Sequence, residues 1–202
     1  MRYSLKATGG GTGSPVSLEE LKLHLRVDGD EEDSLLTSLL QTAKEKVEAL
    51  TERQMMQGTF TIVFDELPVS RWRPGKPYPA AVIKLPKAPL VSVQRVAYRG
   101  TDGVERDIDP GSYTVDSASE PGRVVLHDGW PVVDTTRPGA LTVEFTAGYE
   151  NADAVPASIK AAMKLFCGHL YKHREAVIAG AVAETPLAFD ALLQPFKVEG
   201  FV

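Results

Sequence analysis

Residues 28–53 read DGDEEDSLLTSLLQTAKEKVEALTER, and their pattern is the strongest structural signal in the chain. Acidic residues dominate the opening, where the positive end of a helix macrodipole favours negative charge. The apolar residues that follow recur in steps of four and three, which places them on one face of an α-helix. These residues are Leu36, Leu40, Ala43, Val47 and Leu50. We predict one amphipathic helix over 31–53, about 35 Å long, built for packing rather than chemistry.

Three shorter helices are predicted around it. Ser17 and Glu20 have the spacing of a capping box, so a short helix should begin after Ser17. Pro156 is suited to the first turn of a third helix. Its apolar face contains Ile159, Met163, Phe166, Leu170 and Val177, with His173 on the same face. A last short helix is expected to begin at Thr185-Pro186 and to run through Leu193.

Between these helices the sequence period changes to that of β-structure. The segment from Thr59 to Phe145 is rich in β-branched and aromatic residues and is interrupted by proline and glycine. Strands are predicted at 59–65, 82–85, 91–99, 104–108, 112–116, 123–126 and 141–146. The predicted fold class is therefore α+β, a helical bundle formed by the N- and C-terminal helices with an inserted, mainly antiparallel β region.

The predicted domain organisation follows from these elements. Residues 1–15 are expected to be a flexible N-terminal arm, because they are polar and end in glycines. Residues 16–57 and 151–194 form the helical core, and 58–150 form the inserted β domain. Residues 195–202 are a tail with alternating apolar residues and no element after it. Such a tail either folds back onto the core or anchors to another chain.

Composition excludes several classes of function. The formal net charge is −5, so general electrostatic binding of nucleic acid is not expected. The single cysteine, Cys167, cannot form an intramolecular disulfide, which favours folding in a reducing cytosol. The N-terminal residues lack the apolar region of a signal peptide, and no apolar stretch is long enough to span a membrane.

Two local motifs suggest ligands but fail on inspection. The glycine cluster at 9–13 lacks the Lys-Ser/Thr that completes a phosphate-binding loop. A calcium loop that began at Asp28 would need glycine where Asp33 stands and glutamate where Leu39 stands. We therefore predict no cofactor.

One cluster has the residue types of a metal site. His169 and His173 are four residues apart on the third predicted helix, and Cys167 and Glu175 are close by. A metal-dependent hydrolase using His169, His173 and Glu175 is therefore one hypothesis. Against it, the chain has no HExxH motif, and the apolar face of the helix suits buried structural side chains. We predict no catalytic residue and no metal ligand.

The β region carries a different candidate. Trp72, Trp130 and Tyr78 occur in two proline-containing loops, 66–81 and 127–140. Aromatic residues in such loops either line a ligand groove or fasten the loops onto a sheet. The alternative function is thus a peptide- or sugar-binding module that uses this aromatic-rich β domain.

Four segments together resemble a known family. They are VSLEELKLHLRVD at 16–28, EEDSLLTSLLQTAKEKVEALTER at 31–53, VPASIKAAMKLFCGHLYKHREAV at 155–177 and ETPLAFDALLQPFKV at 184–198. In order and pattern they resemble the head–tail connector (adaptor) proteins of long-tailed phages and of phage-like gene transfer particles. The resemblance is to the longer members, which carry a β insertion between the helical halves.

The resemblance implies a structural role in a virion and no enzyme activity. Proteins of this family form a ring of about a dozen subunits beneath the portal protein, and the ring extends the DNA channel. The expected partners are the portal protein, a tail-side connector or stopper protein and other copies of the chain. Double-stranded DNA would pass through without specific binding, and the protein would be made in the bacterial cytoplasm. By position, portal binding would fall on Phe196, Val198, Phe201 and Val202.

Overall fold

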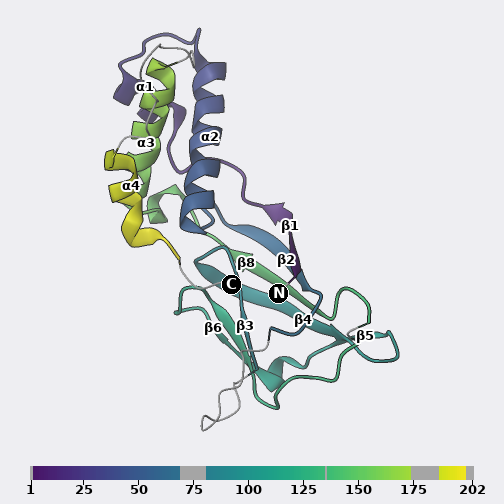
Figure 1. Ribbon diagram of the computed structural model, residues 1–202. Coiled ribbons are helices and arrows are strands. Elements are labelled where there is room, and N and C mark those ends of the chain that lie inside the picture. Colours follow the sequence, from purple (N-terminus) through teal and green to yellow (C-terminus); the bar gives the residue numbers. More distant parts are fainter. Residues whose placement is uncertain (1, 69–80, 135, 174–186, 199–202) are drawn as a thin grey trace. The chain divides into compact units, whose positions relative to one another are not determined.

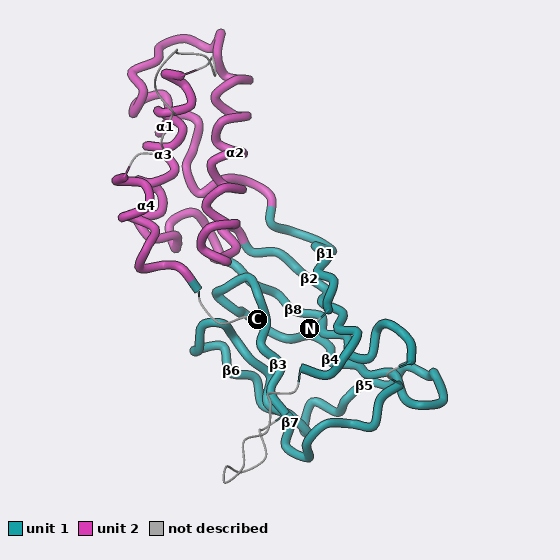
Figure 2. Tube along the Cα trace, in the orientation of Figure 1, with its two compact units in different colours: residues 1–11, 57–148, 198–202 teal, residues 12–56, 149–197 magenta. Residues whose placement is uncertain are grey.

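A computed structural model of the protein describes residues 2–68, 81–134, 136–173 and 187–198. The chain forms two compact units, shown in different colours in Figure 2. The β unit contains residues 1–11, 57–148 and 198–202, and the helical unit contains residues 12–56 and 149–197. Each unit therefore combines segments that are far apart in the sequence.

The helical unit contains the predicted helices. They are α1 (Leu18–Leu25), α2 (Asp33–Thr51), α3 (Ala157–Lys172) and α4 (Leu187–Leu193), with 3-10 turns η2 (Ala152–Ala154) and η3 (Gln194–Phe196). The capping box of α1 is present, because the Ser17 hydroxyl accepts from Glu20 N while Glu20 accepts from Ser17 N. Helix α3 ends at Lys172, and the predicted continuation to Val177 lies outside the described residues.

The core of the helical unit lies where α2 packs against α3, and α4 packs against α3 in turn (Figure 1). The predicted stripe of α2 is confirmed, because Leu36, Leu40, Ala43 and Val47 are buried. From α3 and α4, the residues buried against it include Ile159, Ala162, Met163, Cys167, Phe189 and Leu193. Phe166 and Phe189 stack with ring centroids 5.1 Å apart, which joins α3 to α4.

Two antiparallel sheets make up the described part of the β unit. Five strands follow the order β1-β2-β8-β4-β5, and three follow the order β3-β7-β6. Their bounds are β1 Tyr3–Gly10, β2 Gly58–Phe64, β3 Ala81–Lys84, β4 Leu90–Arg99, β5 Glu105–Asp107, β6 Tyr113–Asp116, β7 Arg123–Leu126 and β8 Leu141–Ala147; a 3-10 turn, η1, spans Pro110–Ser112. Every predicted strand is present, and the predicted α+β class is confirmed.

Alternating side chains build the core of the β unit. Strands β2 and β8 bury every second residue, and Phe60 of β2 stacks on Phe145 of β8 with centroids 5.6 Å apart. Ile83 of β3 and Val124 of β7 belong to the same buried cluster. The two sheets therefore share one hydrophobic core.

The N-terminal segment differs from the expectation. Residues 3–10, expected to be part of a flexible arm, form strand β1 and pair with β2 in an antiparallel register from Tyr3↔Phe64 to Gly10↔Gly58. The pairing explains the difference, because the edge of β2 supplies hydrogen-bond partners that the local sequence does not reveal. Gly10 has φ 69°, and a β-carbon there would lie 2.8 Å from the Gln57 carbonyl oxygen, so this end of the strand requires glycine.

Among the described residues, no helix combines the length and the apolar character needed to cross a membrane.

Candidate functional site

The predicted portal-binding tail is in part a component of the helical core. Phe196 is half-buried and packs against the helical cluster. The Arg53 Nε atom donates to the Phe196 carbonyl oxygen at 2.7 Å, and the Arg53 guanidinium carbon lies 6.0 Å from the centre of the Phe196 ring. Of the two alternatives for the tail, Phe196 therefore follows the first and folds back onto the core.

Arg53 holds the start of the tail because its own position is fixed. Its side chain is buried, just beyond the C-terminus of α2, and one of its guanidinium nitrogens donates to the Tyr149 hydroxyl at 3.3 Å. Val198, two residues after Phe196, is half-buried, and Phe201 and Val202 lie outside the described residues. Whether these four residues bind a portal stays a prediction.

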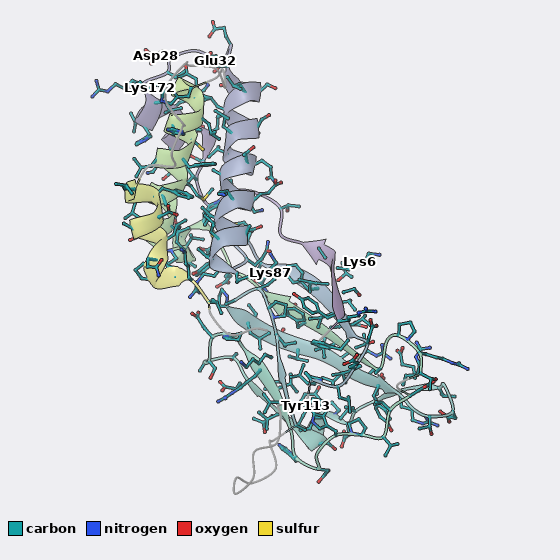
Figure 3. The ribbon with its side chains drawn as sticks, in the orientation of Figure 1. Lys6, Asp28, Glu32, Lys87, Tyr113 and Lys172 are labelled. Atoms are coloured by element: carbon teal, nitrogen blue, oxygen red, sulfur yellow. The ribbon has the colours of Figure 1, made fainter. Side chains whose placement is uncertain are left out.

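The acidic start of α2 lies at one end of the helical unit, where Figure 3 labels Asp28 and Glu32, and its carboxylates form a network. The Lys22 ammonium of α1 forms ion pairs with Asp30, at 3.0 Å, and with Asp33. Hydrogen bonds to Asp33 and then Asp30 raise the pKa of Lys22. The Tyr171 hydroxyl of α3 donates to Glu32. These contacts join α1, α2 and α3 at this end, so the cluster has a structural role besides its interaction with the helix dipole.

The histidines of α3 lie close together, with ring centroids 4.9 Å apart. His173, predicted on the apolar stripe, is exposed at the C-cap instead, because α3 ends one residue before it. Glu175, the third member of the proposed hydrolase site, lies outside the described residues. Within the part of the chain that is described, no three His, Cys, Asp or Glu side chains gather in a geometry for a metal ion.

Cys167 is a core residue rather than a nucleophile. Its side chain is buried in the helical core, and its thiol lies 3.5 Å from the Leu39 carbonyl oxygen. Burial raises the pKa of the Cys167 thiol to about 12, so the reactive thiolate is scarce at neutral pH.

Of the aromatic residues proposed to line a ligand groove, only Trp130 lies in the described structure; Trp72 and Tyr78 do not. Trp130 is half-buried and packs on the core of the β unit. It also lines a hollow of about 280 Å³ together with Tyr98 and three aspartates, Asp107, Asp109 and Asp128. No local sequence pattern reveals this hollow, because its residues come from three separate segments.

The neighbouring sheet surface carries a second charged network. Arg95 of β4 forms ion pairs with Glu105 at 2.7 Å, with Asp107 at 2.6 Å and with Glu144 at 3.5 Å. Hydrogen bonds to Glu105 and Asp107 raise the pKa of the Arg95 guanidinium. The network joins strand β5 to the sheet. Because its charged groups are partly exposed, it contributes little to the free energy of unfolding.

Comparison with known families gives a match over the first half of the chain. Residues 15–110 match the model of the phage gp6-like head-tail connector protein family, which confirms the resemblance inferred from the sequence. These residues contain α1, α2 and the strands from β2 to β5. None of the curated proteins matches the chain.

Solved structures share the fold over nearly the whole chain. A chain from the neck of an empty GTA particle, computed with C6 symmetry, has a TM-score of 0.76 at 21% identity and covers 98% of this chain and 97% of its own. A chain from the virion of a native gene transfer agent (GTA) particle has a TM-score of 0.69 at 22% identity, with the same two coverages of 98% and 97%. A chain from the neck of a native GTA particle, computed with C12 symmetry, has a TM-score of 0.63 at 24% identity. It covers 98% of this chain and 97% of its own.

Proposed function

We propose that this chain, whose residues 15–110 fall in the phage gp6-like head-tail connector family, is the head–tail adaptor of a phage or gene transfer particle. In this proposal it is a structural virion protein that forms a ring under the portal protein. The family match is the observation that carries the proposal. The shared fold with chains from particle necks supports it beyond residue 110.

The ring follows from the kind of assembly in which similar chains are found. Two of the similar structures are necks computed with sixfold or twelvefold symmetry. A closed ring needs two different, complementary surfaces on every subunit, so we propose a heterologous ring of about a dozen copies. The ring would extend the DNA channel and dock the next tail-side connector or stopper protein.

The charge of the chain is compatible with a channel for DNA. With a formal net charge of −5, the subunit neutralises few phosphates on balance, so DNA can slide past without strong binding. The family is that of a structural connector, and our proposal assigns the chain no chemical reaction.

The proposal is tested by assembly with the portal protein of the same particle. Native mass spectrometry of the full-length chain, alone and mixed with portal, should show a ring of about a dozen copies in one of the two samples. Portal immobilised on beads should capture the chain, and the major capsid protein of the same particle serves as the control bait. A chain that stays monomeric in both samples and is not captured by the portal would overturn the proposal.

The tail gives this assay a matched pair of variants. Deletion of 198–202 removes Val198, Phe201 and Val202 but leaves Phe196 and its contacts with Arg53 in place. If these residues anchor the chain, the deletion should abolish capture by the portal while the helical unit stays folded. The Glu150→Gln variant, which changes one exposed side chain, should be captured like the unmodified chain.

A further inference from the structure

The hollow beside Trp130 is formed within the β unit where the two sheets approach each other at one end. Tyr98 belongs to β4 of the five-stranded sheet, and Asp109 follows β5 of the same sheet. Leu126 ends β7 of the three-stranded sheet, and the loop after it contributes Asp128 and Trp130. The hollow is therefore built by both sheets, although its residues are scattered in the sequence.

Backbone hydrogen bonds hold both walls of the hollow. Ile108 N donates to the Val96 carbonyl oxygen at 2.8 Å, which fixes the segment after β5 against β4. His127 N donates to the Ser112 carbonyl oxygen at 2.9 Å, which fixes the end of β7 beside the turn η1. Trp130 packs against the hydrophobic core of the β unit, which restricts the movement of its ring. The hollow is thus preformed, which lowers the entropic cost of binding.

The charges that face the hollow are not balanced. Asp107 accepts a hydrogen bond from Arg95 at 2.7 Å and shares that guanidinium with Glu105 and Glu144. The carboxylates of Asp109 and Asp128 make no ion pair and no side-chain hydrogen bond within the described part of the chain. Burial raises the pKa of Tyr113, and the nearby Asp109 raises it further. Both carboxylates are exposed to solvent, and within the described residues the lining of the hollow places them, without a protein cation, beside two aromatic rings.

We infer that this hollow is a docking site for an arginine side chain presented by a partner protein. A guanidinium stacks on the faces of tryptophan and tyrosine and pairs with carboxylates through two parallel N–H groups. A volume of about 280 Å³ is at the lower end of ligand sites and suits one long side chain. A neutral sugar could stack on Trp130 but would leave both carboxylates uncompensated.

This inference rests on the proposed function, because a connector must dock its neighbours in the particle. The inference adds one contact to the connector role, because the β unit would bind an arginine side chain of a neighbouring protein. The test below measures the hollow in isolated protein and does not depend on a ring or a portal. A failure here therefore leaves the connector proposal standing, and a failure of portal capture leaves this result interpretable.

The experiment uses the fluorescence of Trp130 to report binding in the hollow. The chain has two tryptophans, so Trp72→Phe in the full-length chain leaves Trp130 as the only one. Its fluorescence is titrated with N-acetyl-arginine amide at low salt, and N-acetyl-citrulline amide serves as the uncharged probe of nearly equal shape. We expect a saturable change with the arginine compound that weakens at higher salt. Citrulline should bind at least about fivefold more weakly, because it forms no ion pair.

Two variants then test whether the arginine compound binds in the hollow. Asp109→Asn together with Asp128→Asn removes both charges and keeps the side-chain shape; Asp109 makes no capping bond to η1, so the fold should persist. Arginine binding should fall about fivefold or more in this variant. The matched control, Glu150→Gln, changes an exposed carboxylate outside the hollow and should bind as before. Equal binding of citrulline and arginine, no loss in the double variant, or a saturable response to glucose instead of arginine would each overturn the inference.

Discussion

Replacing Phe196 with alanine should destabilise the helical unit, although the residue lies in a tail after the last α-helix. Phe→Ala costs about 3–5 kcal/mol at a fully buried site. Phe196 is half-buried, so about 2 kcal/mol is expected for the ring, and the lost contact with the Arg53 guanidinium adds about 0.5 kcal/mol. The backbone carbonyl remains, so Arg53 Nε keeps its acceptor. For a chain of this size the midpoint of thermal unfolding should fall by about 5–10 °C.

Calorimetry and urea unfolding of the Phe196→Ala chain measure this loss directly. The control is the deletion of 198–202, which removes the half-buried Val198 and should change the free energy of unfolding by no more than about 1 kcal/mol. The reasoning is refuted if Phe196→Ala is as mild as the deletion. Phe196 would then contribute little to the helical core and would be available to a partner, which is the second of the two alternatives for the tail.

Three further predictions test separate parts of the structure. Ser17→Ala removes the capping box of α1 and should cost about 1 kcal/mol, read as a lower midpoint in urea. Cys167 should react with a disulfide reagent at pH 8 only as the protein unfolds, because burial raises its pKa to about 12; fast labelling of the native chain would contradict this. Hydrogen bonds from Ser119 and then Arg123 lower the pKa of Asp116 to about 2. The ionised Asp116 carboxylate therefore stabilises the fold fully above its pKa in the unfolded chain, near 4, and this stabilisation is lost as the pH falls towards 2. Thermal unfolding between pH 4 and pH 2 should therefore depend less on pH in Asp116→Asn, and an unchanged pH profile would count against the Asp116 contacts.

Much of the fold can be predicted from the sequence because its patterns are local. The four-three spacing of Leu36, Leu40, Ala43 and Val47 depends only on helix geometry, and these residues are buried as expected. Alternation in β2 and β8 similarly reflects the pleat of a strand with one face on the core. The Ser17–Glu20 capping box is also a local signal, and both of its hydrogen bonds are present.

The features that were missed depend on residues far apart in the chain. Strand β1 forms because the edge of β2 is open to it, and the glycines at its end hid that pairing. Phe196 is held by Arg53, 143 positions earlier. The hollow beside Trp130 joins Tyr98, Asp109 and Asp128, which no short motif connects. Such sites follow from tertiary packing, which the pattern of a single segment does not encode.

The interleaving of the two units has a consequence for synthesis on the ribosome. The helical unit needs both residues 12–56 and residues 149–197, and α3, which covers the apolar stripe of α2, ends at Lys172. At about 5–20 residues per second, about 120 residues and therefore roughly 6–24 seconds separate the completion of α2 from that of α3. During this interval α3 is not yet available to bury Leu36 and Leu40, so we expect these side chains to be accessible to chaperones. Soluble yield should therefore rise when a holdase chaperone is co-expressed, even though the finished protein buries the same side chains.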